Sequence, residues 1–396
     1  MILNWDRINP LIGLLTLVLS QLASLIVFIL FSKEIAGQLG TAFLWANFLS
    51  QIVFLGGDQA VVKYGISPNK NKFIEAKTAY FIISLMMSVS LTFLFYKVDH
   101  LVELNNIYGV FTLSFILLFI SKWLEVFAKI HKKYHHFIFI TFLSALLLII
   151  SYFYTYFSSE KNVYFDLEIN RLIAIIIFLF VFFINYKNEI IKSRITNVIN
   201  IIKENIFFTV LLVFSLLNIF IDKLYLSIAL PSSNYADYML LMAIYNLAIQ
   251  PKMVITNQLI SEINNVNYYY KVRKTSVIYT SIMFILSLPL YWITVSYILH
   301  GYNFELNLLI ILAMSGILES YLGPCNMILS MVYNPSKNII PEIMGFLLVG
   351  GAILLFLSGP LSVEKSMEIM ISIFAISRVL IALFKLIILK KSNYFS

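Results

Sequence analysis

Long apolar stretches fill most of the chain, and short polar stretches separate them. Most of the apolar stretches reach about 20 residues, the length that an α-helix needs to cross the hydrocarbon of a bilayer. They lack the alternation of apolar and polar residues over about 10 positions that is typical of membrane β-strands. This pattern predicts an all-α integral membrane protein.

We expect about twelve transmembrane helices. Their predicted bounds are 10–31, 40–64, 73–96, 105–128, 136–157, 165–185, 205–230, 235–262, 276–299, 306–330, 339–358 and 367–389. The connections are short, and no stretch has the composition of a soluble domain. No small-residue cleavage site follows the first apolar segment, so we interpret it as an uncleaved span.

Two of these segments carry polar interruptions at the same depth. In residues 40–64, Gly56-Gly57-Asp58 begins 16 residues after Gly40, and in residues 235–262, Pro251 of Gln250-Pro251-Lys252 lies 16 residues after Tyr235. Interrupted spans at matching positions in two halves of a chain indicate a transporter's substrate path. We therefore expect a break in both helices.

Composition supports a membrane protein and excludes some other classes. Of 396 residues, 60% are hydrophobic and 12% charged, and the mean hydropathy is +0.89. A soluble protein of this size needs more polar surface. The single cysteine, Cys325, excludes an intramolecular disulfide and a cysteine metal site. We assign the net charge of +8 to cytoplasmic loops and expect no nucleic-acid partner.

The distribution of Lys and Arg predicts the orientation. With the N-terminus inside, the cytoplasmic segments hold 20 of these residues and the outer loops hold 5. This bias predicts that both termini are cytoplasmic. The longest basic connection follows the sixth span, so we predict an N-terminal lobe (1–190), a basic connection (191–204) and a C-terminal lobe (205–396). Six spans in each lobe make the two halves parallel.

Charged residues deep in a span cost roughly 2.5–3.5 kcal/mol each on insertion and are functional candidates by default. Arg378 lies nine residues into the apolar stretch 369–389, close to the midplane. Its alternative is a structural ion pair with another helix. Glu319 is either a proton or sodium site or a polar spot beside Gly323-Pro324. Lys252, which follows a proline, either faces a cavity or extends to the inner interface.

Two further pairs are adjacent or nearly so in the sequence. Asp222 and Lys223 point about 100° apart on a helix, so we expect no pairing between them, and Lys223 has the alternative of extending to the outer headgroups. Asp58 and Lys63 lie near the inner end of the second span, where a local ion pair is the alternative to function.

Sequence patterns of several enzyme classes are missing. There is no GxxxxGK[ST] phosphate loop, HExxH helix or GxSxG elbow. His131 and His135 have a helical ligand spacing, but the surrounding lysines repel a dication, so we interpret this cluster as a contact for anionic headgroups. We expect no catalytic residue, metal or cofactor.

Several segments together resemble a known family. They are LGGDQAVVKY at the end of the second span, Asp222 in the seventh, and NYADY and QLISEINN around the eighth. The chain resembles the Wzx-type O-antigen and polysaccharide flippases of the multidrug/oligosaccharidyl-lipid/polysaccharide exporter superfamily over residues 5–390. The resemblance implies two lobes around a central cationic cavity. It also implies ion-coupled, alternating-access transfer of undecaprenyl-diphosphate-linked oligosaccharide to the outer leaflet.

The resemblance also implies a location, partners and roles. The location is the bacterial cytoplasmic membrane, and the partners are the bilayer, the lipid-linked oligosaccharide, and the polymerase and chain-length proteins of the same pathway. Relatives commonly have a basic residue at Lys63 and an acid at Asp222. We expect the cations Arg378, Lys252, Lys63 and Lys223 at the diphosphate; Asp222, Glu319 or Asp58 at a coupling proton or sodium ion; and Asn47, Gln51, Asn218, Asn246 and Gln250 as polar lining.

Two other functions are compatible with the sequence. A multidrug exporter of the same fold would favour acids in its cavity, whereas the deep charges here are three cations against about three acids. A membrane polysaccharide polymerase would need a large outer loop, and the longest predicted one has about 12 residues.

Overall fold

The computed structural model describes most of the chain. The described residues are 16, 19, 22–23, 25–66, 70–98, 108–131, 134–157, 163–191, 198–258, 263, 265–299, 301–303, 306–333, 336–357, 363–392 and 394. Within these ranges the regular structure is entirely helical, which confirms the predicted all-α class.

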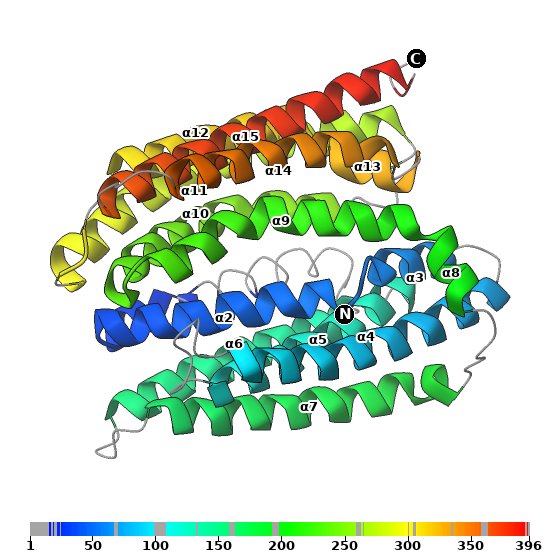
Figure 1. Cartoon of the computed structure of the whole chain (residues 1–396), viewed down its shortest axis with the longest axis horizontal. Coiled ribbons are helices and arrows are strands. Elements are labelled where there is room, and N and C mark those ends of the chain that lie inside the picture. The colour runs from blue at the N-terminus through cyan, green and yellow to red at the C-terminus, as the bar shows by residue number, and fades with distance from the viewer. Residues whose placement is uncertain are drawn as a thin grey trace, which may run out of the picture. The chain divides into compact units, whose positions relative to one another are not determined.

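The chain divides into two compact units. We call residues 38–216 the N-terminal unit, and residues 217–396 together with 1–37 the C-terminal unit. In each of them the long helices run roughly side by side (Figure 1). The predicted lobes, 1–190 and 205–396, remain a prediction.

The N-terminal unit holds most of α2 and the helices up to the first part of α9. Their bounds are α2 Lys33–Ile52, α3 Gly57–Ile66, α4 Lys70–Val98, α5 Tyr108–His131, α6 Tyr134–Phe157, α7 Val163–Ile191, α8 Val198–Glu204 and α9 Ile206–Ala229. Its core includes Trp123, whose ring centroid lies 5.4 Å from those of Phe54 and Phe81. The Trp123 indole donates to the Ser84 hydroxyl (3.3 Å), so its buried N–H is satisfied.

The C-terminal unit continues from α9. Its other helices are α10 Ser232–Gln258, α11 Val266–Ile293, extended by a π-helical turn Thr294–Ile298, α12 Leu306–Leu322, α13 Cys325–Met331, α14 Ser336–Leu357 and α15 Val363–Lys391. The start of α2 packs here, since the Ser232 carbonyl fills the space where a side chain on Gly37 would lie.

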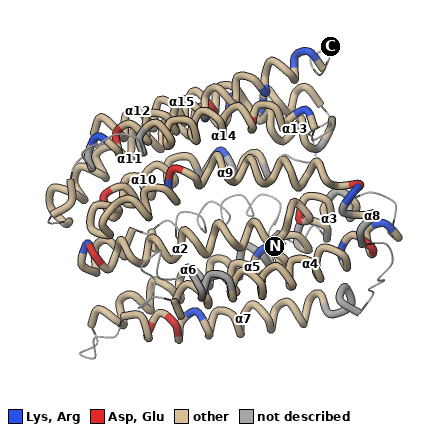
Figure 2. Tube along the Cα trace, viewed as in Figure 1, with Lys and Arg blue, Asp and Glu red and all other residues tan. Residues whose placement is uncertain are grey.

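Seven described helices are long and apolar enough to span a bilayer. They are Asn71–Phe93, Tyr108–Phe127, Val163–Tyr186, Ile206–Ala229, Val266–Ile298, Ser336–Leu355 and Lys365–Lys391, and Thr141–Phe157 and Leu306–Leu322 are shorter apolar helices. Large apolar side chains such as Phe93 and Leu355 are exposed on them, as expected where lipid replaces water. Charged residues lie mainly toward the helix ends (Figure 2). The chain is therefore a multi-pass membrane protein.

The predicted break in the second span is confirmed. Helix α2 ends at Ile52 and α3 starts at Gly57, with positive φ at Leu55 (47°) and Gly56 (76°). A Cβ on Gly56 would lie 2.6 Å from the Phe208 carbonyl carbon, so the position needs glycine. The Thr209 hydroxyl donates to the Leu55 carbonyl (2.6 Å) and satisfies an oxygen that the helix leaves free.

The prediction of a matching break at Gln250-Pro251-Lys252 is wrong. Helix α10 continues through these residues from Ser232 to Gln258. A proline removes one backbone donor, but the helical path can continue when the surrounding packing holds it. The C-terminal unit is instead broken at Gly323-Pro324, between α12 and α13, where Gly323 has φ 83°. The two halves therefore do not share interruptions at equivalent predicted positions.

Candidate functional site

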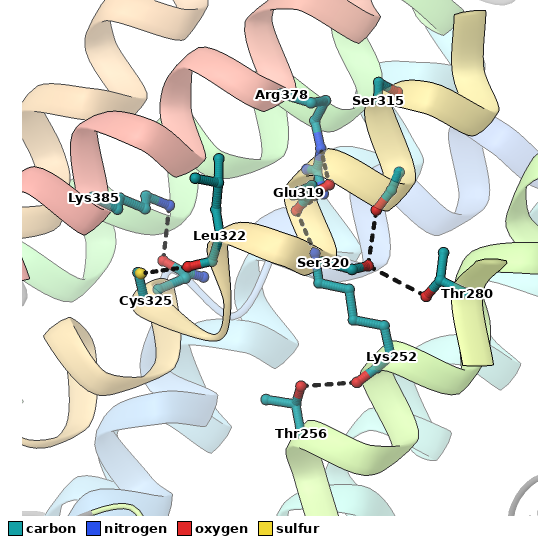
Figure 3. Close-up of polar contacts among 12 residues, drawn as sticks. Lys252, Thr256, Thr280, Ser315, Glu319, Ser320, Leu322, Cys325, Arg378 and Lys385 are labelled. Carbon is teal, nitrogen blue, oxygen red and sulfur yellow. Dashed lines mark hydrogen bonds and ion pairs between the residues drawn. The ribbon is translucent and has the colours of Figure 1, made fainter. Parts of the chain in front are cut away.

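Three charged residues predicted as separate candidates form one cluster in the C-terminal unit. Glu319 of α12 lies between Arg378 of α15 and Lys252 of α10 (Figure 3). Glu319 Oε1 lies 2.8 Å from Arg378 Nη2 and 2.9 Å from Lys252 Nζ. Arg378 Nε also donates to Glu319 Oε2 at 3.3 Å. We call these three residues the Glu319 cluster; it is the interhelical ion pair that was the alternative interpretation of Arg378.

Small and hydroxylated residues on α12 position Glu319. Gly316 lies one turn before it, and a Cβ there would lie 3.0 Å from the Phe284 ring, so neighbouring aromatic rings pack close to the helix. The next residue, Ser320, donates to the Gly316 carbonyl (2.8 Å) and contacts the Thr280 hydroxyl of α11 (3.3 Å). These contacts hold α12 against α11 and α10, and thereby fix the depth of the carboxylate.

The Glu319 cluster carries an excess of positive charge and is partly accessible. Its two cations face one carboxylate. The side chain of Arg378 is 26% exposed, Lys252 15% and Glu319 14%. A guanidinium offers several donors in a planar fork, and a carboxylate occupies only part of it. The arrangement can therefore bind an anion in exchange for Glu319.

Asp222 and Lys223 form a second cluster, contrary to the prediction that they do not pair. Lys223 Nζ lies 3.2 Å from Asp222 Oδ1, and Asp222 Oδ2 accepts from the Tyr238 hydroxyl at 2.6 Å. The lysine stem folds back, so that Nζ also donates to the Ile219 carbonyl (2.6 Å) and lies 4.3 Å from the Phe374 ring centroid. The lysine side chain is long enough to bring Nζ back to Asp222, although the two residues point about 100° apart on the helix.

Lys223 also does not extend to outer headgroups, because it is buried (8% exposed). Asp222 is 1% exposed. This second cluster is thus closed off within the unit, and its carboxylate already has a cation and a hydroxyl as partners.

Sequence reasoning missed a third charged group, the Glu342 network. Glu342 of α14 pairs with Lys385 of α15 and accepts from Asn218 Nδ2 of α9 at 2.6 Å. Lys385 also donates to Asn326 Oδ1 of α13 at 2.9 Å, and Asn338 donates to the same oxygen at 3.1 Å. Asn218, predicted as cavity lining, is 1% exposed and belongs to this network.

A spacing in α15 carries a signal for this network. Lys385 follows Arg378 by seven residues, which is two helical turns, so both cations lie on the same face of α15. Asn326 likewise follows Glu319 by seven residues, on the other side of the Gly323 break. Lys385 lies near the end of the predicted span 367–389, and its side chain is buried.

The remaining predicted residues have local partners or lie outside the description. In the N-terminal unit Asp58 pairs with Lys122 at 3.4 Å, and Gln51 donates to Asn47 at 2.9 Å. Asn246 of α10 is half-buried. The side chains of Lys63 and Gln250 lie outside the described part of the structure, as do those of the basic and histidine cluster around His131.

The comparisons with known proteins agree on a fold. No protein-family model matches the chain, and no curated protein matches it in sequence. Three similar solved structures cover nearly all of it. A MATE protein in a bent conformation is 15% identical, with a TM-score of 0.63, and the match covers 97% of this chain and 95% of that one. An inward-facing multidrug resistance MATE family transporter of the MOP superfamily is 15% identical, with a TM-score of 0.64 and coverages of 95% and 96%.

The third similar structure is a MOP superfamily transporter from Pyrococcus furiosus, for which a reverse polarity of the binding pocket suggests a different function. It is 15% identical, with a TM-score of 0.64, and the match covers 98% of this chain and 95% of that one. At these identities the likeness shows the fold alone. The chain has the fold of MATE transporters of the MOP superfamily, as the resemblance to a member group of that superfamily implied.

Proposed function

We propose that the protein is a flippase that moves undecaprenyl-diphosphate-linked oligosaccharide from the cytoplasmic to the outer leaflet of a bacterial cytoplasmic membrane. It works by alternating access of two six-helix lobes around a central cavity, with twelve spans and both termini in the cytoplasm. It is a transporter and not an enzyme. The MATE fold supports this class, and the sequence resemblance supports the cargo.

The Glu319 cluster is the observation that carries the proposal. A diphosphate and a polar glycan cannot cross hydrocarbon unaided, because both lose hydration without replacement partners. Lys223, Lys252, Arg378 and Lys385 are four cations within helices of the C-terminal unit, and they pair with three carboxylates. The excess of one positive charge lies in the Glu319 cluster, the most accessible of the three groups. This polarity favours an anionic cargo over a cationic drug.

In the proposed mechanism Glu319 is an internal counter-anion. Without cargo it neutralises Arg378 and Lys252 and so limits the cost of two cations inside the membrane. When the diphosphate arrives, its oxygens take the place of the carboxylate, with Arg378 binding through its fork and Lys252 as a point charge. Since Glu319 competes with the cargo, binding stays weak enough for release on the other side.

Other predicted residues have lesser roles in this proposal. Lys63 helps the diphosphate to enter and leave, and Asn47, Gln51, Asn246 and Gln250 line the glycan path. Lys223 is buried against Asp222 and therefore acts with that residue instead of with the cargo. Asp222 carries the coupling to a proton or sodium gradient. Its Tyr238 and Lys223 contacts change when a cation neutralises its charge.

The test measures lipid-linked glycan on each leaflet in cells whose own copy of the protein has been removed and that carry either the wild-type chain or a variant on a plasmid. The wild-type chain should clear complete repeat units from the cytoplasmic leaflet, and Arg378→Gln should leave them there. Lys33→Gln is the matched control, because it breaks an ion pair of similar length (2.8 Å to Asp237) in the same unit but outside the Glu319 cluster. Normal clearing by Arg378→Gln would overturn the proposed site.

The main alternative is export of another compound, as in the multidrug MATE transporters that share this fold. A cationic drug would favour an excess of acids, whereas Asp222, Glu319 and Glu342 face four cations, Lys223, Lys252, Arg378 and Lys385. An unchanged glycan pool together with altered drug sensitivity would favour this alternative. If, in cells without the protein, repeat units reach the outer leaflet but stay unpolymerised, the protein would instead be a polymerase.

A further inference from the structure

A cavity of about 490 Å³ lies at one end of the C-terminal unit, separate from the Glu319 cluster. The start of α11 contributes Tyr269, Tyr270 and Arg273, the end of α12 contributes Tyr321 and Leu322, and the last turns of α15 contribute Leu386 and Lys390. We call it the Arg273 pocket. It holds two cations, and no acidic side chain lines it in the described part of the chain.

The break at Gly323 builds the wall of this pocket. Gly323 has φ 83°, and a Cβ there would lie 2.5 Å from the Tyr269 ring, so the ring packs directly on the backbone. The Tyr269 hydroxyl donates to the Leu322 carbonyl at 3.1 Å and satisfies an oxygen at the C-terminal end of α12. This packing fixes Tyr321 and Leu322 at the pocket.

Two tyrosines hold Arg273: its guanidinium hydrogen-bonds to the Tyr269 hydroxyl, which leaves other N–H donors of the fork available. Its guanidinium carbon lies 4.0 Å from the Tyr321 ring centroid, a cation–π contact that uses the face of the guanidinium and not its N–H edge. The C-terminal end of α12 also favours a cation at this place. Tyr270 and Tyr321 are each more than half exposed, so the pocket is open to its surroundings.

The depth of the pocket indicates what surrounds it. Helix α11 begins its span at Val266 and α15 ends its span at Lys391, so the pocket lies where two spans end. Exposed Lys271 and Lys274 lie at the same end of α11. Cations and tyrosines at this level meet the headgroups of the bilayer, and the leucines of the pocket meet the first carbons of the chains.

We propose that the Arg273 pocket binds the phosphate of an anionic glycerophospholipid. Arg273 and Lys390 contact the phosphate oxygens, and Leu322 and Leu386 contact the acyl chains next to the glycerol. The ligand is a structural lipid of the membrane and is distinct from the transported cargo, so this inference does not rest on the proposed function.

The test uses the full chain in nanodiscs and native mass spectrometry to count retained phosphatidylglycerol against phosphatidylcholine. Wild type should retain phosphatidylglycerol in preference. Arg273→Gln with Lys390→Gln should weaken its binding by about tenfold or more, because these two residues line the pocket and each change removes a charge-assisted hydrogen bond to the phosphate. Lys271→Gln with Lys274→Gln is the matched control, because it removes two charges from the same region outside the lining; its affinity should stay within about twofold of wild type.

Three results would overturn the inference. Equal loss in both double variants would show diffuse attraction and no site. Equal retention of the two lipids would show an apolar contact. Displacement of phosphatidylglycerol by inorganic pyrophosphate at the same concentration would assign the pocket to soluble phosphates. If the Arg273 and Lys390 double variant does not fold, each single variant should show an intermediate loss, and no loss in either would also contradict the proposal.

Discussion

Glu319→Gln should lower the stability of the protein while it raises its affinity for diphosphate. The change keeps the shape of the side chain and removes its charge, so Arg378 and Lys252 lose their shared anion. Each attraction is worth about 4 kcal/mol at 4 Å and an effective dielectric constant of about 20. Because desolvation offsets much of this, removal of one partner from a buried pair typically costs about 3–5 kcal/mol.

The amide of glutamine still accepts one hydrogen bond, so we expect the lower value, a loss of about 3 kcal/mol in the free energy of unfolding. The diphosphate no longer has to displace a carboxylate. The binding free energy of the diphosphate can therefore improve by up to the same 3 kcal/mol, which corresponds to an affinity about 100-fold higher than that of wild type. We expect an increase in affinity of at least about tenfold.

The assay is thermal unfolding of the purified protein in detergent, with and without a short prenyl diphosphate. The variant should unfold at a lower temperature than wild type without ligand. A ligand concentration of about 100 times Kd stabilises by about 2.7 kcal/mol and should recover most of the loss. For the same rise in unfolding temperature, the variant should need a lower ligand concentration than wild type needs.

Glu342→Gln is the matched control. It also neutralises a carboxylate that pairs with a cation in the C-terminal unit, but its side chain and that of Lys385 are only 6% exposed. It should be destabilised, and its gain in stability from the prenyl diphosphate should be no larger than that of wild type at the same ligand concentration, because its Glu319 cluster is unchanged. If Glu319→Gln responds to ligand no better than wild type, or if Glu342→Gln recovers equally, Glu319 is not a counter-anion that the cargo displaces.

Three further predictions concern stability and are checked by unfolding of purified variants. Gly56→Ala should destabilise the protein by about 1–3 kcal/mol, because Gly56 has φ 76° and the Phe208 backbone fills the space where a Cβ would lie. The control Gly351→Ala, in open space on α14, should be neutral or stabilising by up to about 1 kcal/mol, and equal effects of the two changes would contradict this. Tyr238→Phe removes the 2.6 Å hydrogen bond to Asp222 and should cost about 1.5–3 kcal/mol, and a loss under about 0.5 kcal/mol would exclude a role for that bond. Lys385→Met should cost about 3–5 kcal/mol, and adding Glu342→Leu should recover much of it, whereas additive losses would show that the pair is not coupled.

The general class of the fold was accessible to sequence reasoning because it depends on local properties. A run of about 20 apolar residues must be helical in a bilayer whatever its neighbours are, since every backbone polar group needs a partner within the segment. The break at Gly56 also follows from a local property of the sequence. Glycine tolerates positive φ at little steric cost, so two glycines and an aspartate mark a point where the helix ends.

The break expected at Pro251 shows where local reasoning fails. A proline weakens one turn of a helix, and whether the helix stops depends on what packs around it. In α10 the helix continues, and the C-terminal unit is broken at Gly323-Pro324, where a glycine at positive φ precedes the proline. The side-chain ring of Tyr269 occupies the space beside that glycine, which no local pattern indicates.

By itself, the sequence determined that Arg378, Lys252 and Glu319 are unusual, because a charge within an apolar helix is costly in any fold. Only the tertiary structure decided that these three residues share one contact, since their helices are separated by long stretches of chain and side-chain direction depends on helix rotation. It also paired Lys223 with Asp222 and placed Lys385 against Glu342. Such pairings follow from packing in three dimensions, because an ion pair inside a membrane needs its partner within about 4 Å, and sequence spacing does not give that distance between helices.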